Sequence, residues 1–292
     1  MEYKSVKKEL IGTLIEIKLP KKISFLFPSL FDEIERIEKK YSRFLDDSYL
    51  EQINFNLGIW QKVDFETIFL IRKSMNVKEK TNGNFDITLK NTLENLGYDK
   101  NYSFKVKKTK TKFKESNEEI KIDKNKILLN KEIEFGGIGK GYAIDRISKI
   151  IEEQNIFDYY INAGGDILAR HENKKEYWEI LLEHPDDDKR VIGKIDLNNM
   201  SISSSSPNKR NWKESHHLIN SKTKKPISEI KSIFVMTKTA IESDSYATAL
   251  FTSGFISAIE ISKKLKLPVL IISSENKMYK SDDFNVNIFK LK

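Results

Sequence analysis

The chain has 292 residues, no cysteine and a formal net charge of +8. The length permits one large domain or two closely packed ones. The lack of cysteine excludes disulfides, thiolate metal sites and a cysteine nucleophile. Basic and acidic residues are interspersed and no basic strip alternates with aromatic residues, so the sequence does not indicate nucleic-acid binding. The charge could still attract an anionic cofactor or an acidic partner.

No apolar segment reaches the length that a membrane span requires. The first residues of the chain contain no apolar core of a signal peptide. We therefore expect a cytoplasmic protein. A periplasmic or lipid-anchored protein whose leader had been removed would give the same pattern.

The predicted elements change in type along the chain. Residues 10–19 alternate apolar and polar side chains, which predicts a strand. A helix is predicted after Pro28-Ser29, and a second helix begins after Asp64 as its N-cap. Residues 100–133 are lysine-rich with weak alternation, which favours exposed β-hairpins. The later predictions are strands at 159–161, 233–237 and 269–273, a hairpin from 177–183 and 193–197, and helices at 244–253 and 255–265. This order indicates an α+β fold.

Residues 136–145 place four glycines around Lys140, directly before an apolar pattern with helical spacing. Glycines let the backbone approach a ligand closely, and a helix N-terminus attracts phosphate. Lys140 could add a positive charge there. The pattern is neither the P-loop nor the dinucleotide-binding fingerprint. The alternative is a tight turn between a strand and a helix.

Two carboxylate-containing segments follow. Asp166 ends an Asn-Ala-Gly-Gly-Asp segment after a strand-like run, and Asp244 opens a second apolar pattern. Asp244 and Thr248 are four residues apart, so both lie on one helical face. A carboxylate and a hydroxyl are suited to Mg²⁺ held together with substrate phosphates and waters. The alternative is that Asp244 caps the helix and Thr248 packs inside.

The order of these segments resembles the ApbE family, the FAD:protein FMN transferases. The resemblance extends over nearly the whole chain. The matching segments are Gly12-Thr13, Tyr41-Ser42-Arg43-Phe44 with Ser48 and Asn54, residues 83–88, 136–145 and 162–166, His217-Leu218-Ile219-Asn220, and residues 244–249. The resemblance implies one domain over residues 1–292, with a mixed β-sheet core, surrounding helices and a T-fold-related, two-lobed architecture. A flavin cleft would lie between the lobes.

The reaction implied by the family transfers FMN from FAD to a threonine or serine hydroxyl of a target flavoprotein, and AMP leaves. By resemblance, Mg²⁺ is bound by Asp244, Thr248 and the carbonyl of Gly137, with Gly139 as the alternative. His217 is the candidate base, because histidine titrates near neutral pH. His216 could replace it, and a role for His217 in a surface turn is the alternative.

Further positions match the part of the family that contacts FAD. Phe44 and Ile11 would line the flavin pocket, or both would be ordinary core residues. The other positions that match the FAD-contacting part of the family pattern are Asn84, Phe85, Asp86, Glu134, Lys140 and Asp166. Asp86 and Asp166 could instead brace turns.

Two segments depart from the family pattern. Residues 203–207 lack the glycine that relatives carry, although Arg210 falls in register. Residues 220–224 lack the expected aspartate, proline and glycine. A serine in place of a glycine could remodel the first loop, which affects docking of the target protein more than FAD binding. Two alternatives therefore stay open: a FAD pyrophosphatase that releases FMN and AMP, and a degenerate member that binds FAD without turnover.

Overall fold

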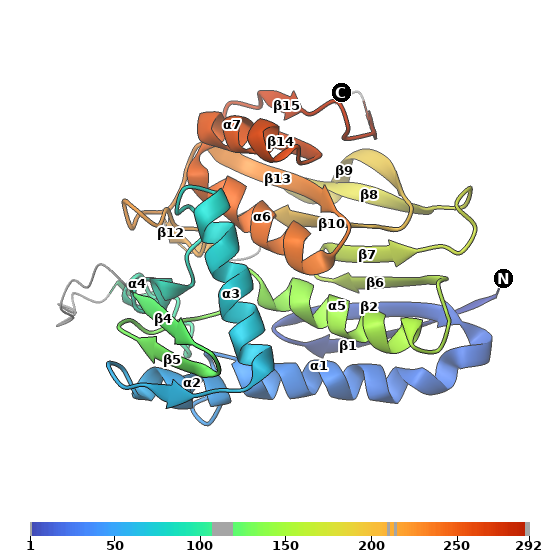
Figure 1. The fold of residues 1–292 in the computed structure, drawn as a ribbon. Coiled ribbons are helices and arrows are strands. Elements are labelled where there is room, and N and C mark those ends of the chain that lie inside the picture. The colour runs from blue at the N-terminus through green and yellow to red at the C-terminus, as the bar shows by residue number, and fades with distance from the viewer. Residues whose placement is uncertain (1, 107–118, 209–210, 213–214, 290–292) are drawn as a thin grey trace.

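The computed structural model describes residues 2–106, 119–208, 211–212 and 215–289. An eight-stranded sheet runs through the molecule (Figure 1). In spatial order its strands are β1 (Tyr3–Leu10), β2 (Thr13–Pro20), β6 (Tyr159–Ala163), β7 (Asp166–Arg170), β10 (Met200–Ser205), β13 (Ile230–Thr237), β14 (Val269–Ser273) and β15 (Met278–Lys280). The expected α+β class is confirmed. The pairing is more uniform than the expected mixed sheet, because every pairing of these described strands is antiparallel.

The two faces of the sheet are both buried. Successive side chains of a strand point to opposite faces, and β13 follows this rule. Ile233 and Val235 join the core under the helices, whereas Phe234 joins a separate core on the other face. On β14, Ile271 and Ile272 divide in the same way. Burial on both faces explains why residues 269–273 form a continuous apolar run in the sequence.

Helices cover one face of the sheet (Figure 1). They are α1 (Phe27–Tyr41), α3 (Phe65–Lys80), α5 (Gly139–Glu152), α6 (Ala240–Ser253) and α7 (Phe255–Leu265). Asp64 caps α3 as expected, because its side chain accepts a hydrogen bond from Thr67 N. Helix α6 begins earlier than expected, so Asp244 lies in its second turn and is not its N-cap. In the described part of the chain, no helix is both long enough and apolar enough to cross a bilayer.

A smaller sheet packs on the opposite face. It consists of β8 (Trp178–His184), β9 (Asp187–Leu197) and β16 (Val286–Ile288). The hairpin of β8 and β9 was expected and is confirmed. Its apolar side chains share a core with the outer face of the large sheet.

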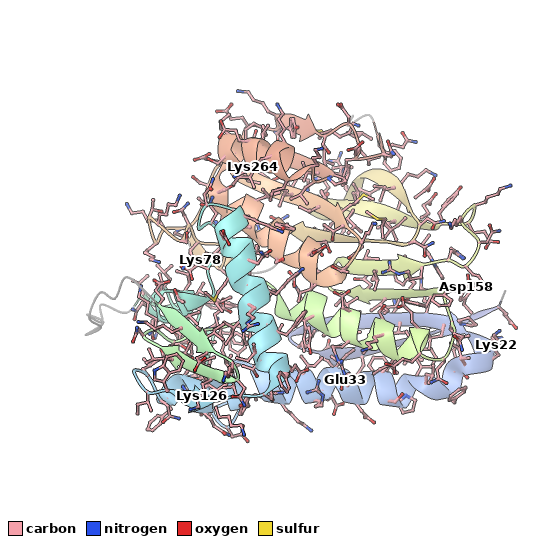
Figure 2. The ribbon with its side chains drawn as sticks, in the orientation of Figure 1. Lys22, Glu33, Lys78, Lys126, Asp158 and Lys264 are labelled. Atoms are coloured by element: carbon pink, nitrogen blue, oxygen red, sulfur yellow. The ribbon has the colours of Figure 1, made fainter. Side chains whose placement is uncertain are left out.

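Short elements make up the end of the molecule below and beside α3 (Figure 1). They are the 3-10 helix η2 (Ile87–Leu89), helices α2 (Tyr49–Phe55) and α4 (Lys90–Asn95), and strands β3 (Gln61–Lys62), β4 (Ile120–Asp123), β5 (Lys126–Leu129), β11 (Asn211–Trp212) and β12 (Ser215–His216). The 3-10 helix η1 (Lys21–Leu26) lies at the other end of the molecule, directly before α1. The hairpin expected within residues 100–133 is confirmed for β4 and β5. The expectation for residues 107–118 lies outside the described residues. Figure 2 labels Lys78 on this side of the molecule and Lys22 on the opposite side.

The strand expected at residues 10–19 is in fact the end of one strand, a turn and most of the next. Ile11 and Gly12 have φ angles of 49° and 69°, which breaks the strand. The turn joins β1 to β2 in an antiparallel hairpin. Gly12 therefore lies in the turn and not on a strand.

Candidate functional site

A cavity of about 310 Å³ collects most of the site residues that the sequence predicts. Its walls come from the β1–β2 turn, the segments around η2 and α5, the end of β10, the segment after β12, and α6. The predicted residues on its walls are Phe44, Asn84, Phe85, Asp86, Glu134, Gly137, Lys140, His217, Asp244 and Thr248. The chain thus brings ten separate predictions together in one place.

The N-termini of α5 and α6 are tied together by two carboxylates. Asp145, on α5, accepts hydrogen bonds from Ala240 N at 2.8 Å and Ile241 N at 2.9 Å, and so caps α6. Burial raises the pKa of Asp145 to about 6. In return, Asp244 Oδ2 on α6 accepts a hydrogen bond from Gly141 N at 2.9 Å. A Cβ atom at Gly141 would lie only 2.6 Å from the Ala240 carbonyl carbon, so this crossing requires glycine.

Asp244, Thr248 and Gly137, which the sequence predicts as metal ligands, all line the cavity. Asp244 is 3% exposed and Thr248 lies one turn further along α6. The backbone of Gly137 lies against Thr248, because an added Cβ atom would be 2.9 Å from Thr248 Cγ2 and 3.2 Å from its Oγ1. The described residues contain no group of three or more His, Asp or Glu side chains that could hold a metal. One carboxylate, one hydroxyl and one peptide carbonyl fit Mg²⁺ only when substrate oxygens and waters complete its shell.

Lys140 lies between two buried carboxylates. Its Nζ atom is 2.5 Å from Asp166 Oδ2 and 3.3 Å from Asp244 Oδ1. Burial raises the pKa of Asp166, and the ammonium group of Lys140 opposes this. Asp166 is 2% exposed and is not on the cavity wall, so its contact with the site is through Lys140.

A buried arginine lies between aromatic rings on the cavity wall. The Arg43 guanidinium is 4.3 Å from the Phe44 ring centre and 4.6 Å from that of Tyr98. Its Nη2 donates to Tyr98 O at 2.9 Å, and its Nε is 4.0 Å from Glu134 Oε2. Within the described residues, Arg43 Nη1 makes no hydrogen bond. Glu134 also accepts a hydrogen bond from Gly136 N at 2.6 Å, which fixes the start of the glycine segment.

The two apolar residues expected to line the flavin pocket differ in position. Phe44 stacks on Tyr102, with 5.2 Å between ring centres, and lines the cavity. Ile11 is not on the cavity wall and packs against the core under the helices. The neighbouring Gly12 and Thr13 of the β1–β2 turn line the cavity, and the contact of Ile11 with flavin stays a prediction.

The polar groups of the segment before η2 form hydrogen bonds with other residues of the cavity wall or of the adjoining turn. Asn84 O accepts a hydrogen bond from Thr252 Oγ1 of α6 at 2.7 Å. Asp86 Oδ1 accepts from Thr88 N at 2.9 Å and caps η2. Phe85 is 3% exposed and lies between these two residues. Asp86 therefore braces a turn and lines the cavity at the same time.

The two adjacent histidines have different surroundings. His217 is half-buried on the cavity wall, with its ring centre 5.9 Å from that of Tyr98. His216 is not on the wall. Its Nδ1 accepts from Leu218 N at 3.1 Å, and its Nε2 is 2.9 Å from Ile227 O, so the bonding pattern assigns the proton to Nε2. Burial lowers the pKa of His216. His216 is therefore bonded to the backbone, and of these two adjacent histidines it is His217 that lines the cavity.

The first part of the serine segment is a strand. Ser203, Ser204 and Ser205 continue β10 and pair with β13. Ser203 Oγ lies 2.8 Å from Ser243 Oγ of α6, so the serine joins the sheet to the helix. Arg210 lies outside the described residues.

Several wall residues were not expected from the sequence. They are Thr13, Leu89, Leu93, Tyr98, Glu183, His184, Pro185, Asn208 and Thr252. Thr252 could have been found, because it lies one helical turn after Thr248. His184 and Pro185 come from the β8–β9 turn, and no local pattern indicates that this hairpin reaches the cavity.

Comparison with known proteins decides the family. The ApbE family profile matches residues 11–271. The chain belongs to the ApbE family. The FAD:protein FMN transferase of Haemophilus influenzae is 28% identical over 272 residues, covering 84% of this chain and 79% of the relative. The enzyme of the same name from Buchnera aphidicola subsp. Schizaphis graminum is 26% identical and covers 95% of this chain and 88% of the relative.

Solved ApbE structures share the fold. The ApbE protein of Thermotoga maritima superimposes with a TM-score of 0.88 at 24% identity, covering 97% of this chain and 98% of that chain. The flavin transferase ApbE from Vibrio cholerae gives a TM-score of 0.82 at 20% identity, with the same coverage. The profile thus confirms the family resemblance over residues 11–271, and these structures show that the fold is shared over 97% of the chain.

Proposed function

We propose that this ApbE-family protein transfers FMN from FAD to a threonine or serine hydroxyl of a target flavoprotein and releases AMP. The names of its relatives support this activity. The observation that carries the proposal is the single cavity lined by His217, Lys140 and Asp244. These residues supply a proton acceptor, a phosphate-attracting charge and a carboxylate from three distant segments.

In the proposed reaction, the acceptor oxygen attacks the phosphorus of the FMN half of FAD. The new P–O bond forms while the bond to the AMP phosphate breaks, and AMP leaves with the electron pair. The hydroxyl proton passes to His217, which is half-buried on the cavity wall. Histidine is the side chain whose ordinary pKa lies closest to neutral pH, which suits a general base. His216 does not compete for this role, because both its ring nitrogens contact backbone groups.

The group formed by Asp244, Thr248 and Gly137 would hold Mg²⁺ with the substrate phosphates. When bound, Mg²⁺ neutralises phosphate charge and stabilises the leaving group. Gly141 N orients the Asp244 carboxylate from the far side. Lys140, 3.3 Å from Asp244, adds a fixed positive charge at the N-terminus of α5, where phosphate is already favoured.

The aromatic part of the cavity wall suits a flat ring system. Phe44 and Tyr98 lie over the Arg43 guanidinium on the wall, and Tyr102 packs against both rings from behind the wall residues. Aromatic rings and buried donors of this kind bind and orient a heteroaromatic ligand. We assign this wall to the aromatic part of FAD.

The test is the release of AMP from FAD in the presence of Mg²⁺, with and without a threonine-containing acceptor peptide, followed by mass spectrometry. We expect AMP together with a peptide that is heavier by one FMN. AMP and free FMN with an unmodified peptide would instead indicate a FAD pyrophosphatase. Bound FAD without AMP release, with or without the peptide, would indicate a FAD-binding protein. Addition of EDTA to the active sample tests the requirement for a divalent cation.

A further inference from the structure

A turn rich in lysine lies next to the cavity. We call residues 220–225 the lysine turn; Lys222, Thr223, Lys224 and Lys225 are all exposed. Its backbone is nevertheless held firmly. Asn220 Oδ1 accepts hydrogen bonds from Lys222 N and Thr223 N at 2.9 and 2.8 Å, and Lys224 N donates to Asn220 O at 2.9 Å. The turn therefore presents its cationic side chains from a fixed backbone.

The lysine turn is anchored to two walls of the cavity. Asn220 Nδ2 donates to Thr252 O of α6 at 2.9 Å, and Ser221 Oγ donates to Gly83 O at 2.5 Å. Ile219, on the cavity wall, forms a β-bridge with Pro226 across the turn. His217 lies only three residues before Asn220 on the same segment. A polypeptide that reached His217 would thus pass close to the lysine turn.

The charges beside the turn are unbalanced. Asp86 and Glu119 are its neighbouring carboxylates, and Lys78 already contacts both, at 3.0 and 2.6 Å. Lys131 contacts Glu119 as well, at 2.5 Å. Although Lys224 is exposed as a whole residue, partial burial of its ammonium group lowers its pKa. The ammonium groups of Lys131 and Lys78 act in the same direction, while the Asp86 and Glu119 carboxylates oppose them.

The lysines of the turn thus have no carboxylate of their own. Among the described residues, no ion pair joins Lys222, Lys224 or Lys225 to an acidic side chain. The ammonium groups of the turn and of Lys78 and Lys131 outnumber the two carboxylates that they face. Such a patch favours an anionic partner, and its exposure favours one that arrives from solvent.

We propose that the lysine turn docks an acidic segment of the acceptor polypeptide beside the cavity. This inference rests on the proposed function, because it takes the acceptor to be a polypeptide. An extended chain covers about 3.3–3.6 Å per residue, so acidic residues a few positions from the acceptor hydroxyl can reach the turn while the hydroxyl lies near His217. The lysine turn is separate from the proposed phosphate site, because Lys140 contacts α6 at Asp244 whereas Asn220 of the turn contacts α6 at Thr252, eight residues further along the helix.

The experiment measures binding of two fluorescein-labelled peptides to the FAD-loaded protein by fluorescence anisotropy. One peptide carries a single threonine flanked by aspartates, and the other has asparagines in their place. The test variant is Lys222→Glu/Lys224→Glu/Lys225→Glu. The matched control is Lys22→Glu/Lys174→Glu/Lys175→Glu, which has the same change in net charge at exposed positions outside the cavity wall. Figure 2 shows Lys22 on the side of the molecule opposite Lys78.

We expect the wild-type protein to prefer the aspartate peptide and this preference to decline with added salt. The lysine-turn variant should bind that peptide about tenfold more weakly, as reversal of several exposed charges predicts, and the control variant should change little. A peptide with lysines around the threonine should bind the lysine-turn variant better than the wild type. FAD affinity, measured by flavin fluorescence, should be equal in all three proteins.

Equal weakening in both variants would overturn the proposal, because the effect would then come from net charge alone. The same conclusion follows if the wild type binds both peptides equally or binds neither. FMN transfer to the threonine is measured in the same samples by mass spectrometry. A wild-type protein that binds the aspartate peptide through the lysine turn but transfers no FMN would refute the proposed function and leave the docking surface in place.

Discussion

Asp244 Oδ2 accepts a hydrogen bond from the backbone N–H of Gly141 at 2.9 Å, across 103 residues of sequence. The bond joins the second turn of α6 to the first turn of α5. Asp145 completes the link by capping α6 from α5. The glycine segment and the Asp244 segment, which are separate motifs in the sequence, therefore form one structural unit at the cavity.

The first prediction concerns the charge of Asp244. Asp244→Asn keeps the side-chain shape and an oxygen that can accept from Gly141 N, but it removes the negative charge. We expect the variant to fold and to release AMP from FAD on the order of 100-fold more slowly, as when one group that stabilises transition-state charge is lost. Asp32→Asn, at an exposed position on α1, is the control. An unchanged rate in Asp244→Asn would exclude Asp244 as the metal ligand.

The second prediction concerns the crossing of α5 and α6. In Gly141→Ala, the new methyl group would overlap the backbone of Ala240, so we expect the free energy of unfolding to fall by about 1–3 kcal/mol or more. Gly139→Ala is the matched control, because its Cβ atom would lie 3.9 Å from the nearest atom, Phe135 Cβ. Alanine there should be neutral or stabilise the helix by up to about 1 kcal/mol. Urea unfolding measures both, and equal effects would contradict the close approach.

The third prediction concerns the contact of Gly137 with Thr248. Gly137→Ala should raise the Mg²⁺ concentration that gives half-maximal AMP release, because the new Cβ atom would press on Thr248 Cγ2 and Phe85 Cε2. Thr248→Ser removes Cγ2 and keeps the hydroxyl, so it should restore part of the loss. The two changes should therefore be non-additive, with a coupling of about 0.5–3 kcal/mol. Additive effects would show that the two residues act separately.

Local sequence patterns were sufficient to predict helices and strands whose ends are determined by neighbouring residues. Asp64 caps α3 through its own side chain, and residues 269–273 are apolar because both faces of β14 are buried. The start of α6 was misplaced because its cap is not local. Thr239 makes no side-chain capping bond, and Asp145 supplies the cap from 95 residues away. Asp244, a favoured capping residue type, was therefore mistaken for the start of the helix.

The order of motifs was sufficient to predict most of the residues on the cavity wall, since each motif contributes to that wall. It gave no sign that the chain reverses at Ile11 and Gly12, because the alternation of apolar and polar residues continues across the β1–β2 turn. It also missed Tyr98 and His184, which reach the cavity from a loop and from the β8–β9 hairpin. These two residues reach the cavity through tertiary packing, which no local sequence pattern shows. The division of the chain into lobes stays a prediction.

The fourth prediction distinguishes the two adjacent histidines. His217→Gln should lower the rate of AMP release by about 100-fold or more, which is the usual contribution of a general base. FAD binding should be retained, and the acid limb of the pH–rate profile should disappear. His216→Gln should change the rate little, because His216 does not line the cavity. A larger loss of rate in His216→Gln than in His217→Gln would reverse the assignment of the base.

The fifth prediction concerns stability at acid pH. Burial lowers the pKa of His216 below its ordinary value of 6.5, so the folded protein disfavours the charged ring. As pH falls below about 6.5, the unfolded chain binds the proton more readily than the folded one. The free energy of unfolding should therefore decrease as pH falls from about 6.5 to the lowered pKa, and this group should contribute no further loss below it.

His216→Gln removes this titration, so urea unfolding at pH 7.5 and pH 5.5 should differ less in the variant than in the wild type. Asp145 changes stability in the opposite direction over the same range, because its pKa is raised to about 6, but its contribution is present in both proteins and cancels in the comparison. His217→Gln is the control, because it also removes one imidazole from this segment but leaves His216 in place. If His216→Gln kept the full wild-type loss of stability between the two pH values, burial of the neutral His216 ring would not be its source.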